Sequence, residues 1–163
     1  MSSDEKFLAD LLRALASAGL EAIVVGMAAA ALQGAPVTTL DVDLLVRDTR
    51  RNREKIRALG AALGAGRPLE ISPVTHALRL VGAAVPVDLI FDAIAGNLSF
   101  ERVRSRSVTV TIAGQRARVA ALEDVIASKE ATGRPKDVAQ LPILRDTLRV
   151  KRALGRRPRP RSS

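Results

Sequence analysis

The pattern of apolar and polar positions predicts helices at both ends of the chain. Leucines spaced by three and four residues between positions 8 and 15 predict a first helix, which begins at Ser3 or Asp4 and ends at Gly19. The last third of the chain predicts a helix over residues 135–154, which Pro142 is expected to kink or split. Further helices are predicted over residues 27–33, 49–63 and 122–132.

Strands are predicted where short apolar runs or a period of two replace the helical spacing. Runs rich in β-branched residues indicate buried strands, whereas the alternation after Leu69, with a turn near Gly82, indicates a strand pair. A later alternating segment that turns at residues 113–114 predicts a short hairpin. The predicted strands cover residues 21–25, 40–46, 77–81, 85–91, 108–112 and 116–119.

Strands and helices follow one another along most of the chain, which indicates an α/β (α+β) fold. A chain of 163 residues can bury one proper core. We therefore expect a single domain over residues 1–154, in which the part from about residue 120 onward is helical. Residues 155–163, rich in arginine and proline, lack apolar periodicity and are expected to form a disordered basic tail.

The net charge of +9 is concentrated at the C-terminal end of the chain. Residues 145–163 carry eight Lys and Arg against one Asp, which leaves only +2 for residues 1–144. The tail could neutralise a few phosphates or could simply keep the protein soluble. A chain without cysteine, with an acidic N-terminus and without an apolar stretch of about 20 residues, is expected to be cytoplasmic and to have no membrane partner.

Two carboxylates, Asp41 and Asp43, lie one residue apart in the apolar segment TTLDVDLLV, residues 38–46. On a strand, both side chains point to the same face about 6–7 Å apart, where two like charges repel each other. A hard divalent cation such as Mg²⁺ between the carboxylates would remove this repulsion. The alternative is a solvated strand end, which an isolated D-x-D segment favours.

Two further features favour a bound divalent cation over a solvated strand end. Gly26 lies between a predicted strand and a predicted helix, where a glycine lets a phosphate approach the backbone and the helix start offers N–H donors. Asp88 interrupts the buried pattern of VPVDLIF and is therefore a third candidate carboxylate. Three acids on strands beside such a turn suit a nucleoside triphosphate with divalent metal ions.

The stretch VVGMAAAALQGAPVTTLDVDLLV resembles the signature of the nucleotidyltransferase superfamily, the polymerase-beta-like fold. In that signature a strand, Gly-Gly or Gly-Ser, a helix and D-x-D follow in this order. The stretch LEDVIASKEATGRPKDVAQLPIL is similar to the C-terminal motif of AbiEii-type toxins and related minimal nucleotidyltransferases. The resemblance covers residues 20–145 and implies a nucleotidyltransferase-like mixed sheet flanked by helices.

The resemblance also implies roles for individual residues. Lys129 and Asp137 match the Lys and the Asp of the C-terminal motif, in which the lysine is a point charge on the triphosphate and the aspartate orients it. These two residues and the three acids are implied to be catalytic. The implied metal ligands are Asp41, Asp43 and Asp88, and the implied nucleotide-binding residues are Gly26, Met27, Thr39 and Lys129.

The implied activity is metal-dependent transfer of a nucleoside monophosphate from an NTP to a hydroxyl of RNA or protein. Mg²⁺ or Mn²⁺ is the implied cofactor. The implied partners are the NTP, a tRNA or other RNA, and a cognate antitoxin or partner protein if the chain is the toxin of a toxin–antitoxin pair.

Two alternatives stay open. Met27 stands where a second Gly or a Ser is usual, and Val37 and Leu40 stand where basic residues are expected. These departures weaken the expected triphosphate affinity and suggest, as the alternative, a catalytically inactive nucleotidyltransferase-like protein that binds a partner protein; the three motif acids still favour an active enzyme. The other alternative is a nucleic-acid binder that uses the basic tail, although a chain without Tyr or Trp has few side chains on which bases could stack.

Overall fold

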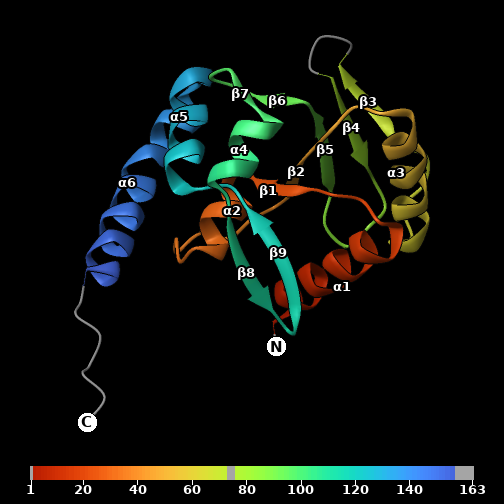
Figure 1. Ribbon diagram of the computed structural model, residues 1–163, viewed down its shortest axis with the longest axis horizontal. Helices are drawn as coiled ribbons and strands as arrows, with labels where there is room; N and C mark the ends of the chain where they lie inside the picture. Colours follow the sequence, from red (N-terminus) through yellow and green to blue (C-terminus); the bar gives the residue numbers. More distant parts are fainter. Residues whose placement is uncertain (1, 73–75, 157–163) are drawn as a thin grey trace.

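The computed structural model describes residues 2–72 and 76–156. A seven-stranded sheet crosses the molecule, with α1 and α3 in contact at one side of it and α5 and α6 in contact at the other (Figure 1). The helices of the described residues are α1 (Ser3–Ala18), α2 (Gly26–Leu32), α3 (Arg50–Ala62), α4 (Phe100–Arg106), α5 (Leu122–Thr132) and α6 (Pro135–Gly155).

The sheet has the strand order β3-β4-β5-β2-β1-β9-β8. β2 is parallel to β5 and β1 is parallel to β9, whereas the other neighbours are antiparallel, so the predicted mixed sheet flanked by helices is confirmed. β6 and β7 form a separate two-stranded ladder. The strands are β1 (Ile23–Val25), β2 (Val42–Val46), β3 (Leu69–Ser72), β4 (Ala77–Leu80), β5 (Val87–Phe91), β6 (Ala93–Ile94), β7 (Leu98–Ser99), β8 (Val108–Ile112) and β9 (Gln115–Val119).

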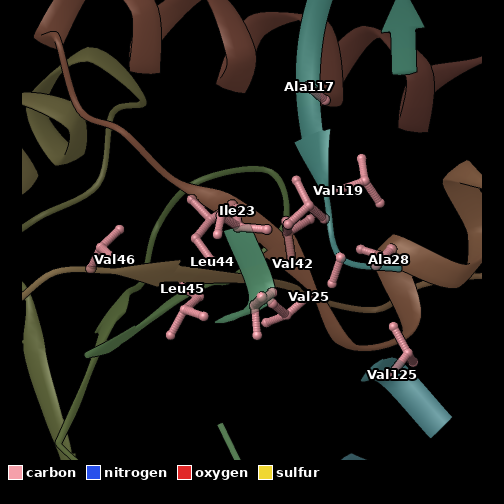
Figure 2. Close-up of a cluster of buried hydrophobic side chains, with 14 of the residues drawn as sticks. Ile23, Val25, Ala28, Val42, Leu44, Leu45, Val46, Ala117, Val119 and Val125 are labelled. Atoms are coloured by element: carbon pink, nitrogen blue, oxygen red, sulfur yellow. The ribbon is translucent and has the colours of Figure 1, made fainter. Parts of the chain in front are cut away.

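The hydrophobic core extends along the sheet from α1 and α3 to α5 and α6, and one part of it lies where β1, β2 and β9 meet α2 and α5. β2 has buried residues on both faces, which explains why its sequence is a nearly continuous apolar run instead of an alternation. Asp43 is the charged residue within that run, and it is only partly exposed. Figure 2 shows the apolar side chains of this region, among them Val25 of β1, Leu44 of β2, Val119 of β9 and Val125 of α5.

The register of the strands places four side chains in a line across the sheet. Val25 of β1 pairs with Asp43 of β2. Asp43 pairs in turn with Asp88 of β5, and Asp88 pairs with Arg79 of β4. Direct cross-strand partners point to the same face with about 5 Å between them. We call Val25, Asp43, Asp88 and Arg79 the cross-strand row.

The junction between β9 and α5 is bonded to both β1 and α2. The amide of Ala120 donates to the carbonyl of Val24 at 2.9 Å. The side-chain amide of Gln33, the residue that ends α2, donates to the carbonyls of Ala120 at 2.8 Å and Ala29 at 3.0 Å. The start of α5 is therefore fixed relative to the strand that leads into Gly26.

Several predicted boundaries are wrong: β1 begins at Ile23 and β5 at Val87, each two residues later than predicted, and two further boundaries differ for identifiable reasons. α1 is capped by Ser2 instead of Ser3 or Asp4, because Ser2 and Glu5 exchange the reciprocal hydrogen bonds of a capping box. β2 begins at Val42 and not at residue 40, so Asp41 precedes the strand. Its partner β5 begins only after Pro86, which has no amide hydrogen to extend the ladder.

The segment between β5 and β8 and the centre of α6 also differ from prediction. β6, β7 and α4 were not predicted, because two-residue strands and a seven-residue helix are too short to produce a periodic pattern. α6 continues through Pro142 and is not split. The carbonyl that loses its intrahelical bond there belongs to Val138, which is 52% exposed and accessible to water.

The predicted basic tail overlaps the last helix by one residue. Gly155, where that tail was expected to begin, is the last residue of α6. Residues 157–163 of the predicted tail lie outside the described residues. Among the described residues, no helix combines the length and the apolar character needed to cross a membrane.

Candidate active site

Three carboxylates lie together at the start of β2 and β5. Asp43 and Asp88 are neighbours in the cross-strand row, and Asp41 lies just before β2. One carboxylate oxygen from each of the three lies within 4.8 Å of the others. Asp41 is exposed, Asp43 is partly exposed and Asp88 is buried, so the cluster runs from the surface into the protein. We call Asp41, Asp43 and Asp88 the carboxylate cluster.

The proximity of the three acids changes the acidity of the central one. Burial, followed by the charges of Asp41 and Asp88, raises the pKa of Asp43 to about 6. The positive charges of Lys129 and Arg79 act in the opposite direction but are weaker. Asp43 therefore holds its negative charge at neutral pH against an unfavourable environment, which a bound cation would relieve.

Gly26 approaches the carboxylate cluster more closely than any other residue type could. Its φ of +65° lies in the left-handed region, which a residue with a Cβ atom adopts only at a cost. A Cβ atom at this position would lie 2.9 Å from Oδ2 of Asp43. The backbone between β1 and α2 is thus close to the Asp43 carboxylate because residue 26 is glycine.

Arg79 binds Asp88 through two hydrogen bonds. Its Nε donates to Oδ1 at 2.7 Å and its Nη2 donates to Oδ2 at 2.9 Å. This pairing raises the pKa of Arg79 further above its ordinary value, so the guanidinium remains charged. The cross-strand row therefore ends in a fixed positive charge.

A second group of charges lies where α5 meets α6. Asp137, which is fully buried, accepts from Nζ of Lys129 at 3.2 Å and from Nε of Arg134 at 2.7 Å. The hydrogen bonds from Arg134, with those from Lys129, hold the pKa of Asp137 well below its usual range. Lys129 is mostly buried and Arg134 is largely exposed, so Asp137 binds one basic side chain inside the protein and one at the surface.

Both charged groups face one cavity of about 540 Å³. The carboxylate cluster, Gly26 and Arg79 line it from the sheet. Lys129 and Arg134 line it from the helices, together with Lys136. The cavity is thus lined by three carboxylates and by the side chains of Lys129, Arg134 and Lys136, a combination that suits a metal-bound polyphosphate.

The sequence of the chain matches the family described as "Nucleotidyl transferase of unknown function (DUF2204)" over residues 4–154. The chain belongs to this family. The resemblance to the nucleotidyltransferase superfamily is thereby confirmed.

Solved structures of nucleotidyltransferases share the fold. The solution structure of the antibiotic-resistance factor ANT(2'')-Ia has a TM-score of 0.66 at 17% identity, covering 94% of this chain and 91% of that one. ANT(2'')-Ia in complex with adenylyl-2''-tobramycin has a TM-score of 0.65 at 19% identity, with coverages of 95% and 98%. TM1012 of Thermotoga maritima, assigned as a nucleotidyltransferase, has a TM-score of 0.61 at 19% identity, with coverages of 91% and 96%. No curated protein matches the chain.

The carboxylate cluster of this nucleotidyltransferase family member fits a divalent cation of the Mg²⁺ type. Carboxylate oxygens are the hard ligands that Mg²⁺ and Mn²⁺ prefer. Their separation of no more than 4.8 Å lets one ion contact more than one of them. The glycine at position 26 keeps the space beside Asp43 free of a side chain.

The residues predicted to bind the nucleotide are not all brought together. Gly26 and Lys129 line the cavity. Met27 does not, because its partly buried side chain packs against the hydrophobic core. Thr39, in the segment before β2, is also not one of the lining residues. Asp137 contributes through Lys129 and Arg134 and does not line the cavity itself.

Sequence reasoning missed Arg79 as a site residue. Arg79 is the charged residue of the apolar segment ALRL, and its partner Asp88 is the charged residue of VDLIF. Both residues interrupt buried patterns on strands predicted to pair, and that coincidence was the available signal. Residues 93–95, which also line the cavity, carried no comparable signal.

Replacing Asp137 with asparagine is expected to lower the free energy of unfolding by about 3 kcal/mol, because a buried charge pair loses one partner. Urea denaturation measures the change. Asp146→Asn is the matched control, since Asp146 also pairs with an arginine three residues away on α6, but at the surface. The control should cost no more than about 0.5 kcal/mol. Equal losses in both variants would contradict the role given to burial.

Proposed function

We propose that this protein is a metal-dependent nucleotidyltransferase that moves a nucleoside monophosphate from an NTP to a hydroxyl group of RNA or protein. The observation that carries the proposal is the single cavity that is lined both by the carboxylate cluster and by the pair Lys129 and Arg134. Membership in a nucleotidyl transferase family supports the reaction class. In the reaction, the acceptor oxygen bonds to the α-phosphorus, the bond to pyrophosphate breaks and the hydroxyl proton is released.

Each wall of the cavity has a part in this reaction. Asp41 and Asp43 would hold the divalent cation, and Asp88 completes the cluster on the same face of the sheet. When bound, a cation of this kind neutralises charge on the phosphates and activates the attacking oxygen. Asp88 is also a candidate to accept the hydroxyl proton, because a carboxylate beside the reacting oxygen can act as a general base.

The positive wall binds the phosphates in this proposal. Lys129 supplies a compact ammonium charge and Arg134 supplies a planar guanidinium that can contact two oxygens at once. Asp137 positions the Lys129 and Arg134 side chains before the nucleotide binds. Gly26 lets the nucleotide approach the backbone next to Asp43.

The acceptor in this proposal is RNA, with tRNA among the candidates, or a protein hydroxyl, as expected of the toxin in a toxin–antitoxin pair. One structural relative, ANT(2'')-Ia, has been solved in complex with adenylyl-2''-tobramycin, so an aminoglycoside hydroxyl is the acceptor to compare. Incubation of the protein with each radiolabelled NTP, Mg²⁺ and one acceptor at a time distinguishes them. Radioactive label on RNA or protein supports the proposal. Label on tobramycin alone would show that the acceptor is an aminoglycoside hydroxyl and not RNA or protein.

Binding of Mg²⁺ together with the correct NTP should raise the thermal stability of the protein. At a ligand concentration about 100 times the dissociation constant, the expected gain is about 2.7 kcal/mol. Differential scanning fluorimetry with each NTP, with and without Mg²⁺, measures the shift in melting temperature. An unchanged melting temperature with all four NTPs would argue against the enzyme.

A catalytically inactive, partner-binding protein is the second candidate. The observation that favours it is that Arg79 already bonds both oxygens of Asp88. This candidate predicts neither transfer nor an NTP-dependent thermal shift, together with a partner protein that co-purifies. Transfer of label in the assay above would exclude it.

A further inference from the structure

Arg79 and Asp88 form a pair that is built into the sheet. The two residues are direct cross-strand partners on β4 and β5, so the backbone register holds them opposite each other. The Asp88 side chain is only 11% exposed, whereas that of Arg79 is 41% exposed. The guanidinium therefore reaches from the wall of the cavity to a carboxylate that solvent barely contacts.

The charges of the cluster indicate what the pair does. Three ionised carboxylates with no cation among them repel one another strongly. Lys129 and Arg134 cannot serve fully as counter-ions, because both are bonded to Asp137. Arg79 bonds a member of the cluster directly, and it reduces the net charge of the cluster from three negative charges to two. Two negative charges match one divalent ion.

We propose that Arg79 takes the place of a second metal ion in the nucleotide-free protein. Asp41 and Asp43 then bind one divalent cation, while the guanidinium of Arg79 stays hydrogen-bonded to Asp88. The inference rests on the proposed function, because it assumes that the carboxylate cluster binds metal. It goes further by fixing the number of ions and by giving a positioning role to a residue outside the motifs.

Two properties of the pair support this role. Its two hydrogen bonds fix the rotation of the Asp88 carboxylate before any ion binds, and one oxygen of that carboxylate stays within 4.8 Å of an oxygen of Asp41 and of Asp43. A guanidinium also keeps its charge at all accessible pH values. Its positive charge beside Asp88 is therefore permanent, whereas a second metal ion would bind and dissociate.

The test is a titration of the full, nucleotide-free chain with Mn²⁺, followed by the electron paramagnetic resonance signal of the free ion. The wild-type chain is expected to bind one Mn²⁺. Arg79→Gln removes the positive charge, so this variant should bind a second Mn²⁺ or bind the first about tenfold more tightly. Arg79→Lys keeps the positive charge and should still bind one Mn²⁺ ion. Comparison of the two variants therefore shows whether the charge of Arg79 or only its packing limits metal binding.

Arg53→Gln is the matched control. Arg53 also forms two hydrogen bonds to an aspartate, Asp48, at 2.7 and 3.1 Å, but neither residue lines the cavity. This variant should bind Mn²⁺ like the wild-type chain. Thermal denaturation of every variant verifies that it is folded.

Several results would overturn the inference. One is the binding of two Mn²⁺ ions with similar affinity to the wild-type chain. Another is a folded Arg79→Gln variant that binds the same number of Mn²⁺ ions with the same affinity as the wild-type chain. In both cases the proposed function would survive, because the metal site would exist. Absence of Mn²⁺ binding even with a non-hydrolysable NTP analogue would remove the metal site, and with it both proposals.

Discussion

Asp43→Asn is expected to inactivate the enzyme and, at the same time, to stabilise the metal-free protein. Loss of a charged ligand at the proposed metal site should reduce nucleotidyl transfer about a thousandfold or more. The same substitution removes a carboxylate whose charge is disfavoured by burial and by two neighbouring acids. The free energy of unfolding at neutral pH should therefore rise by up to about 3 kcal/mol.

The pH dependence of this gain has a definite sign. The pKa of Asp43 is raised from 3.8 to about 6 in the folded protein, so the wild-type chain loses stability as the pH rises between these values. Asparagine does not titrate, and the variant lacks this loss. The difference between variant and wild type should be present above pH 6 and should disappear near pH 4.

Urea denaturation in the presence of a chelator, at both pH values, measures the difference. Asp10→Asn is a suitable control, because Asp10 is exposed and pairs with Arg13 on the same helix. Its effect should stay within about 0.5 kcal/mol at either pH. A destabilised Asp43→Asn variant at neutral pH would contradict the account of the carboxylate cluster.

Gly26→Ala is expected to affect activity far more than stability. The left-handed backbone at residue 26 costs an alanine about 1–2 kcal/mol. The new Cβ atom, 2.9 Å from Oδ2 of Asp43, must also push the carboxylate aside. Displacement of a reacting group by about 1 Å can reduce the rate about a hundredfold, so we expect a loss of at least that size.

Gly64→Ala separates the two effects. Gly64 also has a positive φ, +72°, but a Cβ atom there would meet no atom within 4 Å. This control should lose similar stability and keep its activity. Steady-state transfer rates and urea denaturation of both variants provide the comparison, and equal activity in the two would show that the approach of Gly26 to Asp43 is unimportant.

The part of the site that depends on local sequence was predictable. The order strand, glycine, helix, D-x-D lies within residues 20–46, and each element has its own signal there. The facing positions of Asp43 and Asp88 followed from a period of two on each strand, although their direct pairing depends on the order of strands in the sheet. The nucleotidyltransferase fold followed from the motifs and not from the periodicity.

The contacts of Arg79 and Asp137 could not be predicted in the same way. The Arg79–Asp88 pair requires the register of β4 against β5, and a shift of one residue would turn Arg79 to the other face. The second partner of Asp137, Arg134, became evident only from the turn between α5 and α6. Met27 was assigned by its place in a motif, whereas the packing of its side chain depends on the whole core.

The hydrogen bonds around Ala120 tie together the two walls of the cavity. Ala120 is bonded to β1, which leads into Gly26, and also to Gln33 at the end of α2. α5, which carries Lys129, starts two residues later. In the proposed function, the spacing between Gly26 and Lys129 would therefore depend on the amide side chain of Gln33, which does not line the cavity, and Gln33→Ala would change that spacing without removing a charged group.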